Sequence, residues 1–266
     1  MSSLSARLGG SLSNSLYNGP LGGALRPLAS TRTSTSKRAL WEKVLGSNFA
    51  NNIVGAYDFR DYNGSNLPSK IGPDLETFGV TPDKDGLLFS KSIGSWAYSK
   101  TSVLFRYPFT MAFIAITNNT IGTPTSENIL MHCNTAANGY NQANFPGPHI
   151  FTRTFQQLMP YNGQDNRVTG YLPNGTEWYF FACSFLNNGT VRYATRKPSG
   201  NLNGAVSANN GTTFNGFPGF GHQLYGFSGT MRLGLFINRS FSSIPEMDGL
   251  FNLLFDNGPA SDLKLQ

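Results

Sequence analysis

The acidic side chains of this sequence are few, and their spacing limits the hydrolytic chemistry that the chain could perform. Paired carboxylates cleave glycosidic bonds because one protonates the leaving group while the other attacks or positions water. The chain has five glutamates among its 266 residues, and Glu246 lies two positions before Asp248. We expect both to lie in a helix, where Glu246 would instead stabilise the helix N-terminus. A polysaccharide hydrolase is therefore our least favoured hypothesis.

Nucleophile and metal-binding motifs are missing from the sequence. It contains no Gly-x-Ser-x-Gly and no C-x-x-C, so neither an elbow nucleophile nor a paired-cysteine zinc site is indicated. Asp83 and Asp85 share a loop with Lys84 between them, and calcium requires several oxygen ligands. The three histidines are scattered along the chain: His132, His149 and His222. We therefore predict no metal and no cofactor, and a simple turn around Lys84.

Two stretches combine aromatic rings with amide side chains, the chemistry of sugar recognition. A ring can pack on the C–H face of a sugar while amides hydrogen-bond its hydroxyl groups. The stretches are GYNQANFPGPHIF and FNGFPGFGHQLYGF. Their candidate glycan-binding residues are Tyr140, Asn141, Gln142, Phe145, His149, Phe217, Phe220 and Tyr225. The alternative, which we weigh above this one, is that these aromatics fill the rim of the fold or a subunit interface.

Residues 1–35 are a low-complexity segment of Ser, Gly, Leu, Thr, Pro and Arg that cannot bury enough surface to fold alone. Leucines recur every fourth residue, but glycine pairs and Pro20 disfavour a solitary helix. We interpret this segment as an extended attachment arm whose leucines enter pockets on partner proteins. Its contact residues are predicted to be Leu4, Arg7, Leu8, Leu12, Leu16, Leu21, Leu25, Arg26 and Arg32.

The net charge of +6 is concentrated near the N-terminus. Residues 1–45 carry six basic and one acidic side chain, whereas residues 46–266 carry 14 basic and 13 acidic ones. A near-neutral main domain argues against a nucleic-acid-binding face, and the charges of the arm are spread thinly. We therefore rank nucleic acid below protein as a partner. No apolar run approaches the roughly 20 residues of a membrane span, and we expect neither membrane contact nor a signal peptide.

The remainder of the chain predicts an all-β fold. A short helix and hinge are expected over 36–50, and a period of two in hydrophobicity follows. EWYFFACSF and TVRYATRK flank LNNG and predict a hairpin, and many short strands with Asn-Gly turns indicate a β-sandwich or jelly roll over 51–266. Cys133 and Cys183 are interpreted as small buried side chains, and their pairing is left open.

Two segments near the C-terminus have a clear periodicity. TMRLGLFIN predicts a strand, and its alternation places four side chains on one face: Met231, Leu233, Leu235 and Ile237. SSIPEMDGLFNLLFDNG predicts a helix that Ser243 caps. Four of its side chains share a face that should pack on the sandwich: Ile244, Met247, Phe251 and Leu254.

The order of these segments resembles the concanavalin A-like, laminin-G-like jelly-roll family. The similar pieces are IVGAYDFRD, DGLLFSKSIGSWAYSK, PFTMAFIAIT, NGTEWYFFACSFLNNGTVRYATRKPSG and MRLGLFINRSFSSIPEMDGLFNLL. The resemblance implies a jelly-roll sandwich with a core tryptophan at Trp178. Calcium is common in the family, but the acid count here does not support it. Family hydrolases carry E-x-D-x-x-E on a strand, whereas position 251 here is Phe.

The whole layout also resembles structural proteins of tailed-bacteriophage virions, namely head decoration, head fibre and tail fibre proteins. It implies a non-enzymatic, homo-oligomeric virion protein that is held to other virion proteins by its arm and displays the jelly roll. The alternative is a host-glycan adhesin on a tail fibre. The sequence leaves open whether the protein belongs to the head or the tail.

Overall fold

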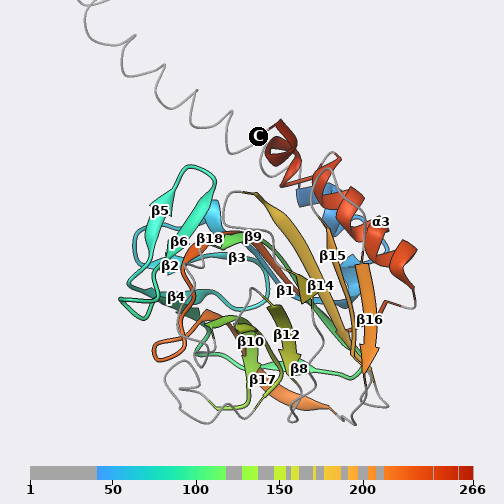
Figure 1. The fold of residues 1–266 in the computed structure, drawn as a ribbon, viewed down its shortest axis with the longest axis horizontal. Helices are drawn as coiled ribbons and strands as arrows, with labels where there is room; N and C mark the ends of the chain where they lie inside the picture. Colours follow the sequence, from blue (N-terminus) through green and yellow to red (C-terminus); the bar gives the residue numbers. More distant parts are fainter. Residues whose placement is uncertain are drawn as a thin grey trace, which may run out of the picture.

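The computed structural model describes residues 41–117, 128–136, 147–153, 157–161, 170–171, 177–186, 191–196, 203–207, 213–241, 243–256 and 258–265. These residues form an all-β sandwich of two antiparallel sheets with two short helices (Figure 1). The predicted fold class is thereby confirmed. None of the described helices is long and apolar enough to cross a membrane. The predicted arm, residues 1–35, lies outside the described residues.

Sheet A is built around the long strands β9 and β18, which are flanked by shorter strands. In spatial order it contains β16 (Asn203–Ser207), β15 (Val191–Arg196), β14 (Tyr179–Phe185), β9 (Phe109–Thr117), β18 (Gly229–Ile237), β1 (Ile53–Asp58) and β3 (Ser69–Ile71). β6 (Gly86–Phe89) also pairs with β18, and β5 (Thr81–Asp83) pairs with β6. β14 and β15 form the hairpin that the sequence predicts.

Sheet B lies opposite and carries the strands of the candidate site. In spatial order it contains β13 (Gly170–Tyr171), β12 (Gln157–Tyr161), β11 (His149–Arg153), β10 (Asn128–Asn134), β17 (Phe214–Gly221), β7 (Trp96–Tyr98), β4 (Leu75–Phe78) and β2 (Asn66–Leu67). β8 (Val103–Phe105) pairs with the other end of β17. The turn between β5 and β6 contains Lys84, as predicted.

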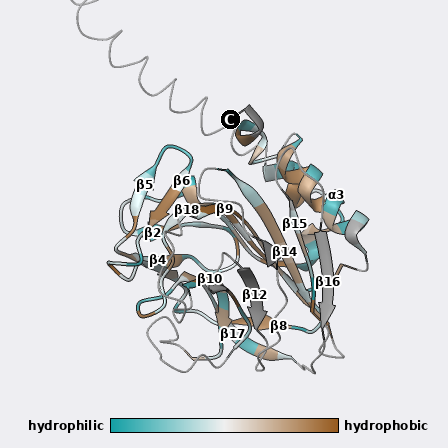
Figure 2. Ribbon diagram, in the orientation of Figure 1, coloured by the Kyte–Doolittle hydropathy of each residue, from teal (hydrophilic) through white to brown (hydrophobic). Residues whose placement is uncertain are grey.

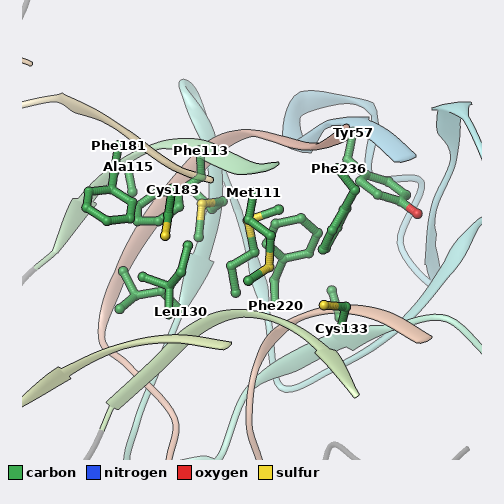
Figure 3. Packing of buried hydrophobic residues seen from close by; sticks show 14 of the residues in the cluster. Tyr57, Met111, Phe113, Ala115, Leu130, Cys133, Phe181, Cys183, Phe220 and Phe236 are labelled. Atoms are coloured by element: carbon green, nitrogen blue, oxygen red, sulfur yellow. The ribbon is translucent and has the colours of Figure 1, made fainter. Parts of the chain in front are cut away.

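The main hydrophobic core fills the space between the two sheets. Alternating side chains of each strand point inward, and Figure 3 shows rings from both sheets meeting there, among them Phe113 and Phe220. Cys133 and Cys183 are both buried in this core and both free, which answers the open question of their pairing. Burial raises the pKa of both thiols, since a thiolate is poorly solvated there.

A second core covers the outer face of sheet A. Helical residues 41–45 and helix α3 (Ile244–Phe255) pack there, and Figure 2 shows hydrophobic segments on α3 and on the strands beside it. Leu233, Leu235 and Ile237 of β18 face these helices, as predicted. Met231 points instead into the core between the sheets, so its predicted placement is wrong. The register of β18 shifts between Met231 and Leu233, and such a bulge reverses the alternation of side chains.

Helix α3 begins after Ser243, where the sequence predicts it, and Met247, Phe251 and Leu254 are buried against sheet A. Ser243 makes no side-chain capping bond, but its carbonyl accepts from the backbone N–H of Met247 at 3.3 Å. Glu246 lies in the first turn and pairs with Arg239. The Glu246 carboxylate therefore serves a structural ion pair at the helix start.

A buried group of charges joins the two ends of the described chain. Asp58 accepts a hydrogen bond from the indole N–H of Trp41 at 3.0 Å and forms an ion pair with Arg60 at 2.6 Å. Arg232, which is fully buried, pairs with Asp262 in the short helix η5 (Ser261–Leu265). The Arg60 bonds and charge hold the Asp58 carboxyl pKa below its usual value although burial opposes this. Two further short helices flank β1: η1 (Ala50–Asn52) and η2 (Phe59–Asp61).

Candidate ligand-binding site

The second predicted sugar-binding stretch is largely a strand, which corrects our interpretation of its aromatics. Phe220 lies on β17 and is fully buried between the sheets (Figure 3). Its ring centroid is 4.9 Å from that of Phe59. It therefore cannot serve as a sugar platform. Phe217 lies on the outer face of the same strand, where it is half-buried and stacks on Tyr98 at 6.0 Å. Its ring is thus engaged in the structure.

His149 and Tyr225 are also packed within the fold. His149 is 4% exposed, and its Nδ1 lies 2.9 Å from the carbonyl oxygen of Gly147. Burial lowers the pKa of His149 to about 4, because the imidazolium loses its hydration. Tyr225 is half-buried, stacks on His222 at 5.2 Å and packs against Ile129. Neither side chain forms the open platform that the sequence suggested.

Several predicted contact residues remain outside the described residues. This holds for four candidates of the first stretch: Tyr140, Asn141, Gln142 and Phe145. It also holds for all the arm residues: Leu4, Arg7, Leu8, Leu12, Leu16, Leu21, Leu25, Arg26 and Arg32. Their roles in glycan and partner binding stay predictions.

The three histidines that are scattered in the sequence lie close together on the outer face of sheet B. His132 and His149 are opposite each other across β10 and β11, and His222 follows β17. The His132 ring stacks on Tyr98 at 5.5 Å. Its pKa is held well below the usual value, first by burial and then by the charges of His222 and His149. Among the described residues no group of three His, Cys, Asp or Glu side chains suits a metal ion.

An exposed pair of aromatic rings, which sequence reasoning missed, lies on neighbouring strands of sheet B. Phe78 of β4 is 50% exposed and stacks on Trp96 of β7, with ring centroids 6.0 Å apart and planes 19° from parallel. The strand register places these two residues directly opposite each other. Leu75 and Ala97 point into the core, so alternation turns Phe78 and Trp96 to the outer face.

Two loops extend this aromatic pair into a larger surface. Ile93 and Leu224 are each 55% exposed, and Gln223 is exposed beside Leu224. The loops that carry them touch, since a Cβ on Gly94 would lie 2.4 Å from the carbonyl oxygen of Gln223. Gly94 also has φ of +68°, which only glycine adopts readily. We call the set Phe78, Ile93, Trp96, Gln223 and Leu224 the edge patch.

Charged groups border the edge patch along the same strands. Glu76 lies two residues before Phe78, on the same face of β4, and its carboxylate is 2.7 Å from the ammonium group of Lys100. Both side chains are largely exposed, at 46% and 71%. The surface therefore offers apolar ring faces next to an amide, a carboxylate and an ammonium group. This mixture can pack against C–H groups and hydrogen-bond hydroxyls.

Comparison with known proteins finds the fold but no sequence family, since no protein-family model and no curated protein matches the chain. A sialidase of Trypanosoma rangeli is structurally similar, with 13% identity and a TM-score of 0.56 over 80% of this chain and 34% of that one. The botulinum neurotoxin serotype D/C binding domain is also similar, with 11% identity and a TM-score of 0.54 over 77% of this chain and 52% of that one. The chain thus spans about a third of the sialidase and about half of the toxin chain.

This likeness corrects one expectation and leaves others untested. The prediction that the chain is not an enzyme is contradicted, since the similar structures include sialidases, one described as a covalent intermediate with 2,3-difluorosialic acid. Because the same fold also occurs in enzymes, the fold gives no reason to exclude an enzymatic activity. The likeness shows the fold alone and assigns no reaction to this chain. Nothing in these comparisons links the chain to a phage virion, so its location, oligomeric state and protein partners remain predictions.

Proposed function

We propose that this protein is a carbohydrate-binding module whose edge patch receives a sugar ring. The observation that carries the proposal is the nearly parallel pair of exposed Phe78 and half-buried Trp96 on the outer face of sheet B. A single exposed hydrophobic side chain is ordinary on protein surfaces. Two stacked rings held in register by paired strands form a preorganised apolar surface, and little side-chain entropy is lost when a ligand covers it.

The polar border of the edge patch favours a sugar over a purely apolar ligand. A sugar presents C–H groups on its ring faces and hydroxyl groups around its edge. The rings can cover the former, while Gln223, Glu76 and Lys100 can bond the latter. A standard protein–protein interface uses about 20–30 residues on each side, which is far more than this patch.

The comparisons support the same chemistry without assigning it. One similar structure is a Trypanosoma rangeli sialidase in complex with sialic acid, 13% identical with a TM-score of 0.54. Another is a receptor-binding domain of a botulinum neurotoxin, 9% identical with a TM-score of 0.51. Binding of sialic acid is a property of that sialidase, and we take it as support for screening sugars first.

A glycan array followed by titration tests the proposal. Trp96 is the half-buried tryptophan of the chain's three, since Trp41 and Trp178 are buried, so its fluorescence should report ligand binding. We expect Phe78→Ala to weaken binding of the array hits about tenfold or more, as for an aromatic hot spot. The matched control is Leu104→Ala, which removes a side chain that is 43% exposed on β8. A blank array, or equal losses in both variants, would overturn the proposal.

A further inference from the structure

His222 organises the loop that contributes Gln223 and Leu224 to the edge patch. Its Nδ1 atom accepts hydrogen bonds from the backbone N–H groups of Leu224 and Tyr225, both at 3.1 Å. A ring nitrogen that accepts carries no proton, so His222 is neutral with its proton on Nε2. The ring is fully buried and stacks on Tyr225. The backbone of the loop thus bends around a single acceptor atom, His222 Nδ1.

The two ends of this loop are fixed to sheet B. On one side Gly221 pairs with Trp96 of β7, so the loop begins next to the edge patch. On the other side the Tyr225 carbonyl accepts from the N–H of Ile129 at 2.6 Å, and Gly226 bridges to Ile129. Between these anchors, the bonds to His222 Nδ1 set the path of the backbone through Gln223 and Leu224.

We propose that His222 is a positioning residue, and that its neutral form holds Gln223 and Leu224 in the arrangement that binds ligand. Protonation of Nδ1 replaces the acceptor by a donor, which faces two N–H donors and breaks both bonds. The loop then leaves its path and the edge patch loses the Gln223 amide and the Leu224 side chain. Ligand binding therefore weakens in acid. This inference rests on the proposed function for its binding consequence, but not for the behaviour of the loop.

Among the described residues, the titratable groups placed around His222 do not offset a new positive charge. His132 of β10 and His149 of β11 lie close enough for their electrostatic interaction with His222 to lower their own pKa values. Tyr225 is a neutral phenol on the same loop. The backbone of Lys91 approaches Gly226 from the loop between β6 and β7, and its ammonium group bonds the Asn128 side chain at 2.7 Å. These neighbours are basic or neutral, so charging His222 adds repulsion.

Backbone NMR tests the loop without any ligand. The amide signals of Leu224 and Tyr225 should move together with one midpoint as the pH falls from 8 towards 4, and their protection factors against hydrogen exchange should fall. The amide of Ser99, bonded to the Pro218 carbonyl at 2.9 Å on the same sheet, is the control and should stay constant. Circular dichroism must show intact sheets throughout. Loop amides that remain unchanged, or that move only with global unfolding, would overturn the inference.

Variants of His222 test the consequence for binding. The Oδ1 atom of asparagine occupies nearly the place of histidine Nδ1, accepts hydrogen bonds and takes no proton near neutrality. Titration uses chitohexaose, cellohexaose and sialyllactose at pH 7.5 and 4.5. For whichever of these sugars binds, the affinity of the wild-type protein should fall at least about fivefold in acid. The His222→Asn variant should bind the sugar equally well at both pH values. The His222→Leu variant should bind it weakly at both. His149→Gln, altered outside the loop, should retain the wild-type dependence.

The outcomes separate this inference from the proposed function. If none of the sugars binds but the loop amides titrate, the role of His222 stands and the carbohydrate assignment fails. If a sugar binds with the same affinity at both pH values, the carbohydrate assignment stands and the role of His222 fails. A His222→Asn variant with the wild-type pH dependence likewise overturns the positioning role.

Discussion

Acidification should destabilise this fold measurably through His149, which is buried in its neutral form. In the unfolded chain the imidazole titrates at its ordinary value of 6.5, whereas burial lowers its pKa to about 4 in the fold. Between these values the unfolded state binds more protons, so the free energy of unfolding falls as the pH falls. The contribution is fully present above pH 6.5 and is lost on the way down to about 4. For one histidine the loss between pH 7.5 and pH 5 is about 2 kcal/mol.

Urea unfolding, followed by far-ultraviolet circular dichroism at pH 7.5 and pH 5, measures this loss. The comparison is between wild type and His149→Asn, since asparagine stays neutral and its amide N–H can take the place of Nδ1 and donate to the Gly147 carbonyl. His132 and the carboxylates add to the loss in both proteins. In the variant His132 also loses the repulsion from His149, which reduces the loss in the same direction. The variant should therefore lose about 2 kcal/mol less than wild type on acidification. Losses that agree within about 0.5 kcal/mol would refute the reasoning.

Three further predictions follow from the packing. Asp58→Asn removes the buried carboxylate that pairs with Arg60 at 2.6 Å and should lower the free energy of unfolding by about 3–5 kcal/mol in urea titrations at pH 7; a loss below about 1 kcal/mol contradicts it. Cys133 and Cys183 should resist a thiol reagent until the protein unfolds, because both are buried with raised pKa values; rapid labelling of the native protein contradicts this. Gly234→Ala would place a Cβ 2.2 Å from the Phe220 ring and should cost about 1–3 kcal/mol by thermal unfolding; an unchanged midpoint would show that the ring moves freely.

The sequence predicts correctly those elements whose hydrophobic periodicity depends on one strand or one helix alone. β14 and β15 alternate around a turn, and α3 repeats its apolar residues every three or four positions. Met231 faces the opposite side from the one that alternation predicts, because the bulge before Leu233 depends on pairing with neighbouring strands. No local pattern in the sequence marks such an insertion.

The candidate site was largely hidden from the sequence for a similar reason. Phe78 and Trp96 are 18 positions apart, and only the pairing of β4 with β7 makes them one surface. Phe220 lies in a stretch whose aromatics and amides predicted sugar binding, yet the segment forms β17 and turns the ring into the core. The bonds from the loop N–H groups to His222 likewise required the three-dimensional path of the chain.

The two faces of the sandwich differ in what they leave accessible. Trp41, the first described residue, is buried with the helices on the outer face of sheet A, whereas the edge patch lies on the outer face of sheet B. The two locations are separated by the full thickness of the sandwich. A group attached to helix α3 therefore lies on the side away from the patch. Immobilisation through α3 would thus leave the aromatic rings on the outer face of sheet B uncovered.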